Sequence, residues 1–212
     1  MHIPDGFIDV PIAVGFAVLS AAALGLAARR AGSAIDGPRA PLLGVTAAGI
    51  FAAQLLDWPL PGGTSAHFVG GAFAAILLGP HLGALAVAAV VTVQALVFGD
   101  GGVVVLGANL WNMAVVEVYA GYAVYRLVAP HGEVAGAFAA GWVASTLGAV
   151  SAALQLGASA AFGYDLLTVL AIMGGLHLAL GLIEGAITAA VTRRITAARP
   201  DVLAGPARGA EA

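Results

Sequence analysis

The first six residues of the chain, MHIPDG, place a histidine second. With a free amine on Met1, two residues offer three nitrogen ligands: the amine, the amide of His2 and Nδ1 of its ring. These atoms close a five-membered and then a six-membered chelate ring in roughly one plane, which suits Ni(II) or Cu(II). One position in that plane stays open for another donor. The ordinary alternative is a surface histidine in a mobile tail.

The elements that would position such a site are strongly hydrophobic. Of 212 residues, 61% are hydrophobic and 9% are charged, and the mean hydropathy is +1.00. A soluble domain has about 25% charged residues, so the composition predicts an all-α integral membrane protein. The chain has no cysteine, which excludes disulfides, thiolate zinc sites and iron–sulfur clusters. It also has no lysine, so it cannot contain a Walker A loop, and a partner must do any ATP-driven work.

Stretches of about 20 apolar residues can cross the hydrocarbon core as helices. We expect about seven transmembrane helices, over residues 8–28, 41–57, 65–79, 82–98, 105–128, 134–157 and 166–192. The third and fourth are divided only by residues 79–81, which predicts a tight helical hairpin. Small residues spaced four apart, such as Gly181 and Gly185, fit close helix packing in lipid.

The placement of the arginines predicts the orientation. With seven spans, all eight arginines lie on one side, which the positive-inside rule makes cytoplasmic. The aspartates on the other side are Asp5, Asp9, Asp57, Asp100 and Asp165. We therefore expect a multi-pass protein of the cell inner (plasma) membrane with its N-terminus outside and its C-terminus cytoplasmic. A single transmembrane metal-binding domain would cover 1–196, and 197–212 would form a disordered cytoplasmic tail.

This topology selects His67 as the candidate fourth ligand. His2 and His67 both belong to the outer end, and His67 lies within the glycine-rich stretch 62–71. Glycines would let the backbone of an inserted N-terminal peptide approach closely. A turn followed by helix packing explains the same glycines equally well.

Two amides lie one helical turn apart at the outer end of the fifth span. Asn109 and Asn112 could bond the inserted peptide or orient a ligand, because amides at membrane depth must find partners. Generic hydrogen bonds between helices are equally plausible for them. The same kind of helix-to-helix bond is the simplest reading of Gln94.

Three further polar residues fall inside predicted spans. Glu117, Glu184 and His177 are costly in lipid unless they face the bundle interior, so each is a functional-site hypothesis. His177 and Glu184 are seven residues apart and share one helix face. For this pair, a structural or partner-contact role is favoured over a proton relay.

In combination, these motifs resemble the CbiM/NikM proteins, the substrate-binding membrane components of energy-coupling factor (ECF) transporters for cobalt and nickel. The likeness covers about residues 1–192. It rests on the opening MHIPDG, GTSAH at 63–67, the glycines at 70–71, FGDGG at 98–102, GAN at 107–109 with Asn112-Met113, and His177 with Gly181, Glu184 and Thr188.

The resemblance implies a seven-helix fold whose added first helix delivers the N-terminus into the outer half of the protein. It also implies that the metal is held by the amine of Met1, the amide and ring of His2, and the ring of His67. The residues expected around these ligands are Asp5, Thr64, Ser65, Asn109 and Asn112. The Pro4-Asp5 opening resembles nickel-type members and planar nitrogen coordination favours nickel, but neither point excludes Co(II).

The predicted function is that of a transporter subunit, not an enzyme. It would capture Ni(II) or Co(II) on the outer face and deliver it to the cytoplasm, with no cofactor. The resemblance implies an ECF coupling protein and ATPase subunits as partners, in the lipid bilayer and without nucleic acid, and leaves open a small accessory membrane protein.

Two rival functions remain. One is a proton-coupled carrier that uses Glu117, Glu184 and His177, with the N-terminus a mere tail. The other is an intramembrane enzyme such as a metal-dependent hydrolase. The sequence lacks an H-E-x-x-H helix and an obvious pairing of nucleophile and base for the second.

Overall fold

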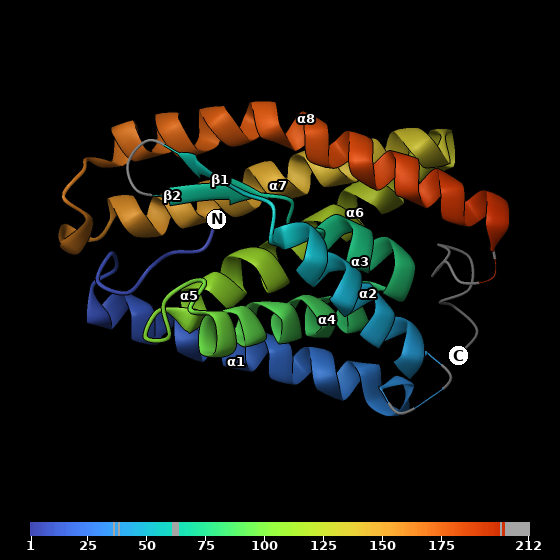
Figure 1. Ribbon diagram of the computed structural model, residues 1–212, viewed down its shortest axis with the longest axis horizontal. Coiled ribbons are helices and arrows are strands. Elements are labelled where there is room, and N and C mark those ends of the chain that lie inside the picture. The colour runs from blue at the N-terminus through green and yellow to red at the C-terminus, as the bar shows by residue number, and fades with distance from the viewer. Residues whose placement is uncertain (36, 38, 61–63, 200, 202–212) are drawn as a thin grey trace.

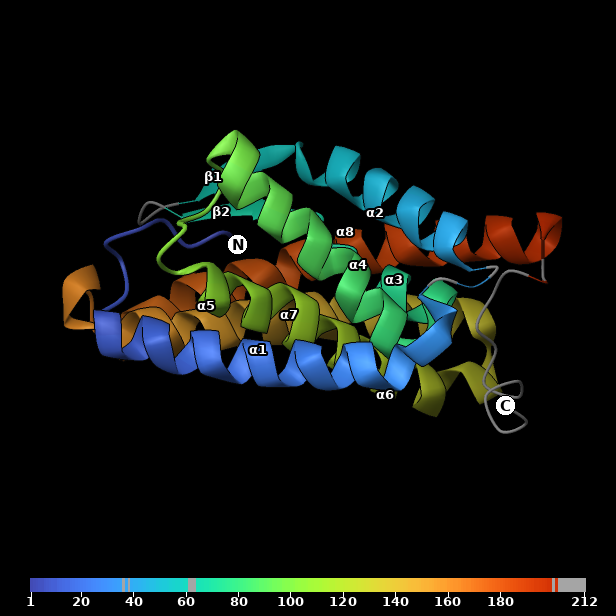
Figure 2. The same cartoon turned by 90° about the horizontal axis from the view of Figure 1, so that it is seen from below.

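The structure is a computed structural model that describes residues 1–35, 37, 39–60, 64–199 and 201. It is a helical bundle with one short β-hairpin (Figures 1 and 2). The α-helices are α1 (Val10–Ala31), α2 (Ala40–Gln54), α3 (Gly71–Leu78), α4 (Pro80–Val93), α5 (Leu106–Leu110), α6 (Val118–Val128), α7 (Glu133–Gly157) and α8 (Leu166–Ala198). The strands are β1 (Asp57–Leu60) and β2 (Thr64–His67).

Shorter helical turns extend or join these elements. The π-helical segments η2 (Gln94–Phe98) and η3 (Trp111–Glu117) continue α4 and join α5 to α6. The 3-10 turns are η1 (Gly32–Ala34), η4 (Ala129–His131) and η5 (Ala160–Phe162). Because π-helical turns are frequent at functional sites, η2 and η3 mark the region of α4 to α6 for attention.

Most predicted spans correspond to helical segments, with ends that differ by a few residues. Four helical stretches are long and apolar enough to cross a membrane: Val10–Ala34, Pro80–Phe98, Glu133–Gly157 and Leu166–Ala198. The helix α2 is apolar but shorter. The chain is thus an α-helical, multi-pass membrane protein, while the full count of seven spans stays a prediction.

The predicted third span, 65–79, is wrong at its start. Residues 64–67 form β2, which pairs antiparallel with β1 so that Asp57 lies opposite His67. Helix α3 begins only at Gly71, after Gly70 adopts a left-handed φ of +78° that favours glycine. Its eight residues extend about 12 Å, which is too short to cross a bilayer. The expected tight hairpin is confirmed, because α4 starts at Pro80 directly after Gly79.

The close packing predicted for Gly181 and Gly185 is confirmed where α8 lies on α7. A Cβ on Gly181 would lie 2.8 Å from Cδ1 of Trp142, and one on Gly185 would lie 2.6 Å from the carbonyl oxygen of Phe138. Larger side chains at these two positions would push the helices apart. The small residues therefore set the α7–α8 distance, as expected for helices that associate in lipid.

The two ends of the bundle differ in charge. At one end, shown at the left of Figure 1, lie the N-terminus, the β-hairpin, the segment before α5 and the α7–α8 connection. The arginines belong to the other end: Arg29 and Arg30 end α1, and Arg126 ends α6. Assignment of the arginine end to the cytoplasm stays a prediction. The predicted tail begins too early, because α8 continues to Ala198; residues 200 and 202–212 of that tail lie outside the described residues.

Candidate metal centre

The N-terminal peptide is buried inside the bundle and is not a surface tail. Met1 and Ile3 are each 1% exposed, and His2 is 4% exposed. Met1 belongs to a core cluster that includes Ile50, and Ile3 belongs to a second cluster that includes Val105. In Figure 2 the peptide runs from α1 into the interior, between the hairpin and α5. The start of the chain is therefore held in a fixed position.

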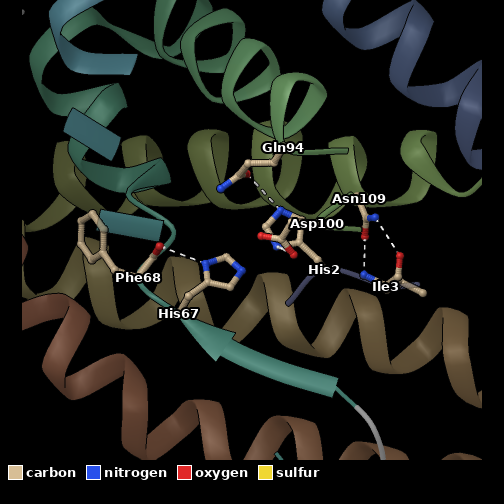
Figure 3. A network of polar contacts seen from close by, with 7 residues as sticks. All are labelled: His2, Ile3, His67, Phe68, Gln94, Asp100 and Asn109. Atoms are coloured by element: carbon tan, nitrogen blue, oxygen red, sulfur yellow. Dashed lines mark hydrogen bonds and ion pairs between the residues drawn. The ribbon is translucent and has the colours of Figure 1, made fainter. Parts of the chain in front are cut away.

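Backbone hydrogen bonds fix this peptide. The side chain of Asn109 bonds both backbone groups of Ile3, accepting from its N–H at 2.8 Å and donating to its carbonyl at 3.0 Å (Figure 3). The amide of Gly102 donates to the same carbonyl at 2.9 Å. Gly101 has a φ of +86°, and a Cβ there would lie 3.1 Å from Cδ2 of His2. The predicted role of Asn109 in bonding the inserted peptide thus has direct geometric support.

Asp5 and Asp9 fasten the same segment further along. The carboxylate of Asp5 accepts hydrogen bonds from the amides of residues 103–105. Asp9 bonds the Ser159 hydroxyl through its own amide, at 2.9 Å, and its carboxylate accepts from the amide of Ala160 at 2.8 Å. Asp5 therefore orders the loop that follows Asp100 beside the site.

The environment of His2 defines its tautomer. Nε2 lies 3.1 Å from the side-chain oxygen of Gln94, which can only accept, so Nε2 carries the proton. Nδ1 keeps a lone pair, is buried and has no hydrogen-bond partner in the described part of the chain. A carboxylate oxygen of Asp100 lies 3.4 Å from Nδ1. A lone pair that faces a carboxylate oxygen favours a cation between them.

His67 presents a matching nitrogen. Its Nδ1 donates to the carbonyl of Phe68 at 3.0 Å, and its Nε2 is buried without a hydrogen-bond partner among the described residues. The rings of His2 and His67 stack with centroids 4.7 Å apart and planes inclined by 24° (Figure 3). The two histidines predicted to converge therefore lie side by side, although 64 positions separate them.

Both imidazoles are held neutral. Burial, and then the nearby terminal amine, lower the pKa of His2 to about 3 and the pKa of His67 well below its usual value. Neutral rings can coordinate a metal without first losing a proton. Within the described residues, no three His, Cys, Asp or Glu side chains are placed to hold a metal ion. A metal bound here would therefore need backbone nitrogens in addition to side chains.

Glu184 positions the segment that follows His67. Its carboxylate accepts hydrogen bonds from the amides of Gly70, at 2.9 Å, and Val69, at 3.3 Å. His177 donates from Nδ1 to the carbonyl of Met173 at 2.8 Å. His67, His177 and Glu184 line one cavity of about 40 Å³. Glu184 thus fixes the backbone just before α3, while the structural or partner-contact role favoured for Glu184 with His177 stays a prediction.

The remaining candidates are distributed differently. Asn112 bonds Gln155 and Ser151, so it belongs to a network apart from the N-terminal peptide. Glu117 is fully buried, and neither carboxylate oxygen has a hydrogen-bond partner among the described residues. Thr64 and Ser65 lie in β2, but the placement of their side chains falls outside what the structure describes.

Gln94 and Asp100 were not among the candidates for the site. Gln94 was interpreted as a bond between helices, and Asp100 was named as an outer-side aspartate and as part of the FGDGG motif at 98–102, without a role toward His2. The available signal was that each is polar at the outer end of a span: Gln94 begins η2, and Asp100 follows it by six residues. No local sequence pattern indicates that Gln94 or Asp100 lies beside His2.

Fold and site together define a multi-pass helical membrane protein. Its N-terminal peptide is buried near one end of the bundle, where the neutral ring of His2 stacks on the neutral ring of His67. The family model described as "Cobalt uptake substrate-specific transmembrane region", CbiM, matches residues 2–202, and the chain belongs to this family.

Individual relatives agree with this assignment. A protein of Haloquadratum walsbyi is 59% identical over 203 residues, which are 96% of this chain and 93% of that protein. The cobalt transport protein CbiM of Geobacter sulfurreducens is 33% identical over 213 residues, covering 96% of this chain and 62% of that protein. A crystal structure of a truncated transition metal transporter matches with a TM-score of 0.89 at 29% identity, over 93% of this chain and 99% of that one.

Relatives in this family are named for nickel transport or for cobalt transport. The chain is therefore a transmembrane component of cobalt or nickel uptake and not an enzyme. The metal ion is its transported substrate rather than a cofactor.

Proposed function

We propose that this chain captures Ni(II) or Co(II) with four nitrogens: the amine of Met1, the amide and Nδ1 of His2, and Nε2 of His67. One observation carries the proposal. The two ring nitrogens that this chelate requires are both buried and have no hydrogen-bond partner among the described residues. Their rings lie 4.7 Å apart, and the opposite nitrogen of each ring is held by an oxygen. Such outer hydrogen bonds fix the tautomer and orientation of metal-binding imidazoles.

The donor set favours Ni(II). Three adjacent nitrogens from Met1 and His2 define a plane, and nickel accepts planar nitrogen coordination more readily than cobalt does. Asp100 is 34% exposed and brings an oxygen to 3.4 Å from Nδ1 of His2. We infer that this carboxylate attracts the cation from solvent and offsets its charge near the site.

Import requires partners. The chain lacks lysine and with it any Walker A loop, so ATP must be hydrolysed by other subunits. We propose that the chain is the substrate-specific component of an ECF-type importer, with the metal centre facing outward and the arginine end facing the cytoplasm. A coupling protein and paired ATPases would then reorient it to release the ion inside.

Metal binding by the purified chain tests the proposal. Titration with Ni(II) in detergent should give one ion per chain and the visible absorption band of planar nickel, and excess Mg(II) should not compete, because Mg(II) prefers oxygen ligands. Binding of Ni(II) with no such band would refute planar nitrogen coordination.

A second candidate, a proton-coupled carrier, is favoured by one observation. Glu117 is a fully buried carboxyl group whose oxygens have no hydrogen-bond partner among the described residues. Buried acidic groups of this kind serve as proton sites in some transporters. Vesicles that contain this chain without ATPases separate the two functions: uptake that an uncoupler abolishes would favour the carrier, and no uptake would favour the ATP-driven importer.

Replacing Gln94 by leucine is expected to weaken Ni(II) affinity by about 10- to 100-fold. The substitution removes the acceptor that holds Nε2–H of His2 and frees the ring to take the wrong tautomer. Isothermal titration measures the effect. Gln155→Leu is the matched control, because it removes a buried amide from the Asn112 network and should leave affinity nearly unchanged. Equal losses in both variants would show that Gln94 supports only the fold.

Ni(II) affinity is expected to fall by about a hundredfold for each pH unit of acidification between about pH 7 and pH 5. Binding must displace one proton from the Met1 amine and one from the His2 amide. The rings add no protons, because burial and the nearby amine lower the pKa of His2 to about 3 and the pKa of His67 well below its usual value. A plot of log affinity against pH should therefore have a slope of about two. A flat plot would contradict the chelate.

A further inference from the structure

A long apolar groove lies between α2 and α8. Its walls include Leu42, Val45 and Ala53 from α2 and Ile187 and Ile195 from α8, with Phe68 between them. Its volume is about 560 Å³. Figure 2 shows α2 along one edge of the bundle. The metal centre does not use this groove.

One end of the groove is positively charged. Arg194 and Arg199 line it there. Leu42, in the first turn of α2, packs on the same cluster as Ile195, so the N-terminus of α2 and the C-terminus of α8 both lie at this end. Their opposite partial charges offset each other, and the positive charge is that of the two arginines. Arg199 also donates to Asp201 at 2.8 Å. Both partners are exposed, and exposed pairs are weak, so a phosphate can replace the carboxylate.

The length of the groove matches one lipid leaflet. From Leu42 to Ala53, α2 rises about 16 Å, and half of the hydrocarbon core of a bilayer is about 15 Å. The apolar wall thus begins at the arginines and ends near the middle of the membrane. An acyl chain whose headgroup lies at Arg194 and Arg199 has this reach and this distribution of charge.

We propose that the α2–α8 groove binds an anionic phospholipid, with an acyl chain along α2 and the headgroup phosphate on Arg194 and Arg199. A guanidinium group can donate two parallel hydrogen bonds to the oxygens of one phosphate. Basic pockets between membrane helices select anionic lipids. Phe68 and Ile187 line both this groove and the cavity beside His67, so the lipid lies one side chain from that cavity.

The absence of cysteine allows a direct test, because a single introduced thiol can be labelled alone. Val45→Cys, at a groove position that is 70% exposed, carries a fluorophore in vesicles of mixed phosphatidylglycerol and phosphatidylcholine. Bromine on the chains of one lipid or the other quenches nearby fluorescence. We expect phosphatidylglycerol to quench at least about threefold more strongly. Val18→Cys on α1, 64% exposed and outside the groove, is the control and should show no preference.

A charge variant completes the test. Arg194→Gln with Arg199→Gln should abolish the preference at Val45→Cys, whereas Arg29→Gln with Arg30→Gln, at the end of α1, should keep it. Ni(II) affinity should stay unchanged in both, which separates this proposal from the metal chelate. A preference equal to that at Val18→Cys, or one that survives loss of both groove arginines, overturns lipid selection.

Discussion

Adding one glycine in front of Met1 is expected to reduce Ni(II) affinity by at least about a thousandfold. The extension moves the histidine to third place, so the amine, the adjacent amide and Nδ1 no longer close the five- and six-membered rings. It also changes where the terminal amine lies relative to the rings of His2 and His67. Titration with Ni(II) measures the loss, and the planar-nickel absorption band should vanish with it.

The burial of Met1 calls for a second variant. Met1 is 1% exposed, so an added residue also needs room in the core. His2→Gln keeps the chain length and removes the ring nitrogen, and it should lose affinity to a similar extent. Thermal unfolding in detergent tests whether either protein is still folded. A folded, extended protein that binds Ni(II) as well as the native chain would exclude the terminal amine as a ligand.

The sequence predicted the features that depend on local composition. Apolar length located the helices, arginine placement separated the two ends, and Gly181 and Gly185 identified a close helix contact. The juxtaposition of His2 and His67 was also predicted, because topology brought both to one end and the resemblance to CbiM/NikM proteins paired them. Each of these predictions used either the spacing of residue types along the chain or the end of the predicted bundle to which a residue belongs.

The errors arise where long-range contacts override local pattern. Residues 64–67 directly precede an apolar stretch and were joined to it, yet they pair with β1, and Gly70 turns the chain before α3 begins. The carboxylate of Glu184 binds the amides of Val69 and Gly70 at this turn, and no local property of Val69 reveals a partner 115 positions away. Gln94 was undervalued for the same reason, since its partner is the second residue of the chain.

His67→Gln is expected to weaken Ni(II) affinity by at least about a hundredfold and to change the visible spectrum. The three nitrogens from Met1 and His2 remain, so some binding persists, and water takes the fourth position in the plane. A glutamine side chain has nearly the length of histidine but offers an amide oxygen, which is a poorer donor to nickel. Loss of one nitrogen should move the absorption band to longer wavelength, which spectrophotometric titration records.

His177→Gln is the matched control for this prediction. His177 lines the same cavity as His67 and also has a buried Nε2 without a hydrogen-bond partner among the described residues. Only His67 stacks on the ring of His2, so His177→Gln should keep Ni(II) affinity within about threefold of the native value. The reverse result, with His177→Gln damaging and His67→Gln harmless, would assign the fourth position to α8. That outcome would move the metal toward Glu184 and favour the interior polar residues as its binding site.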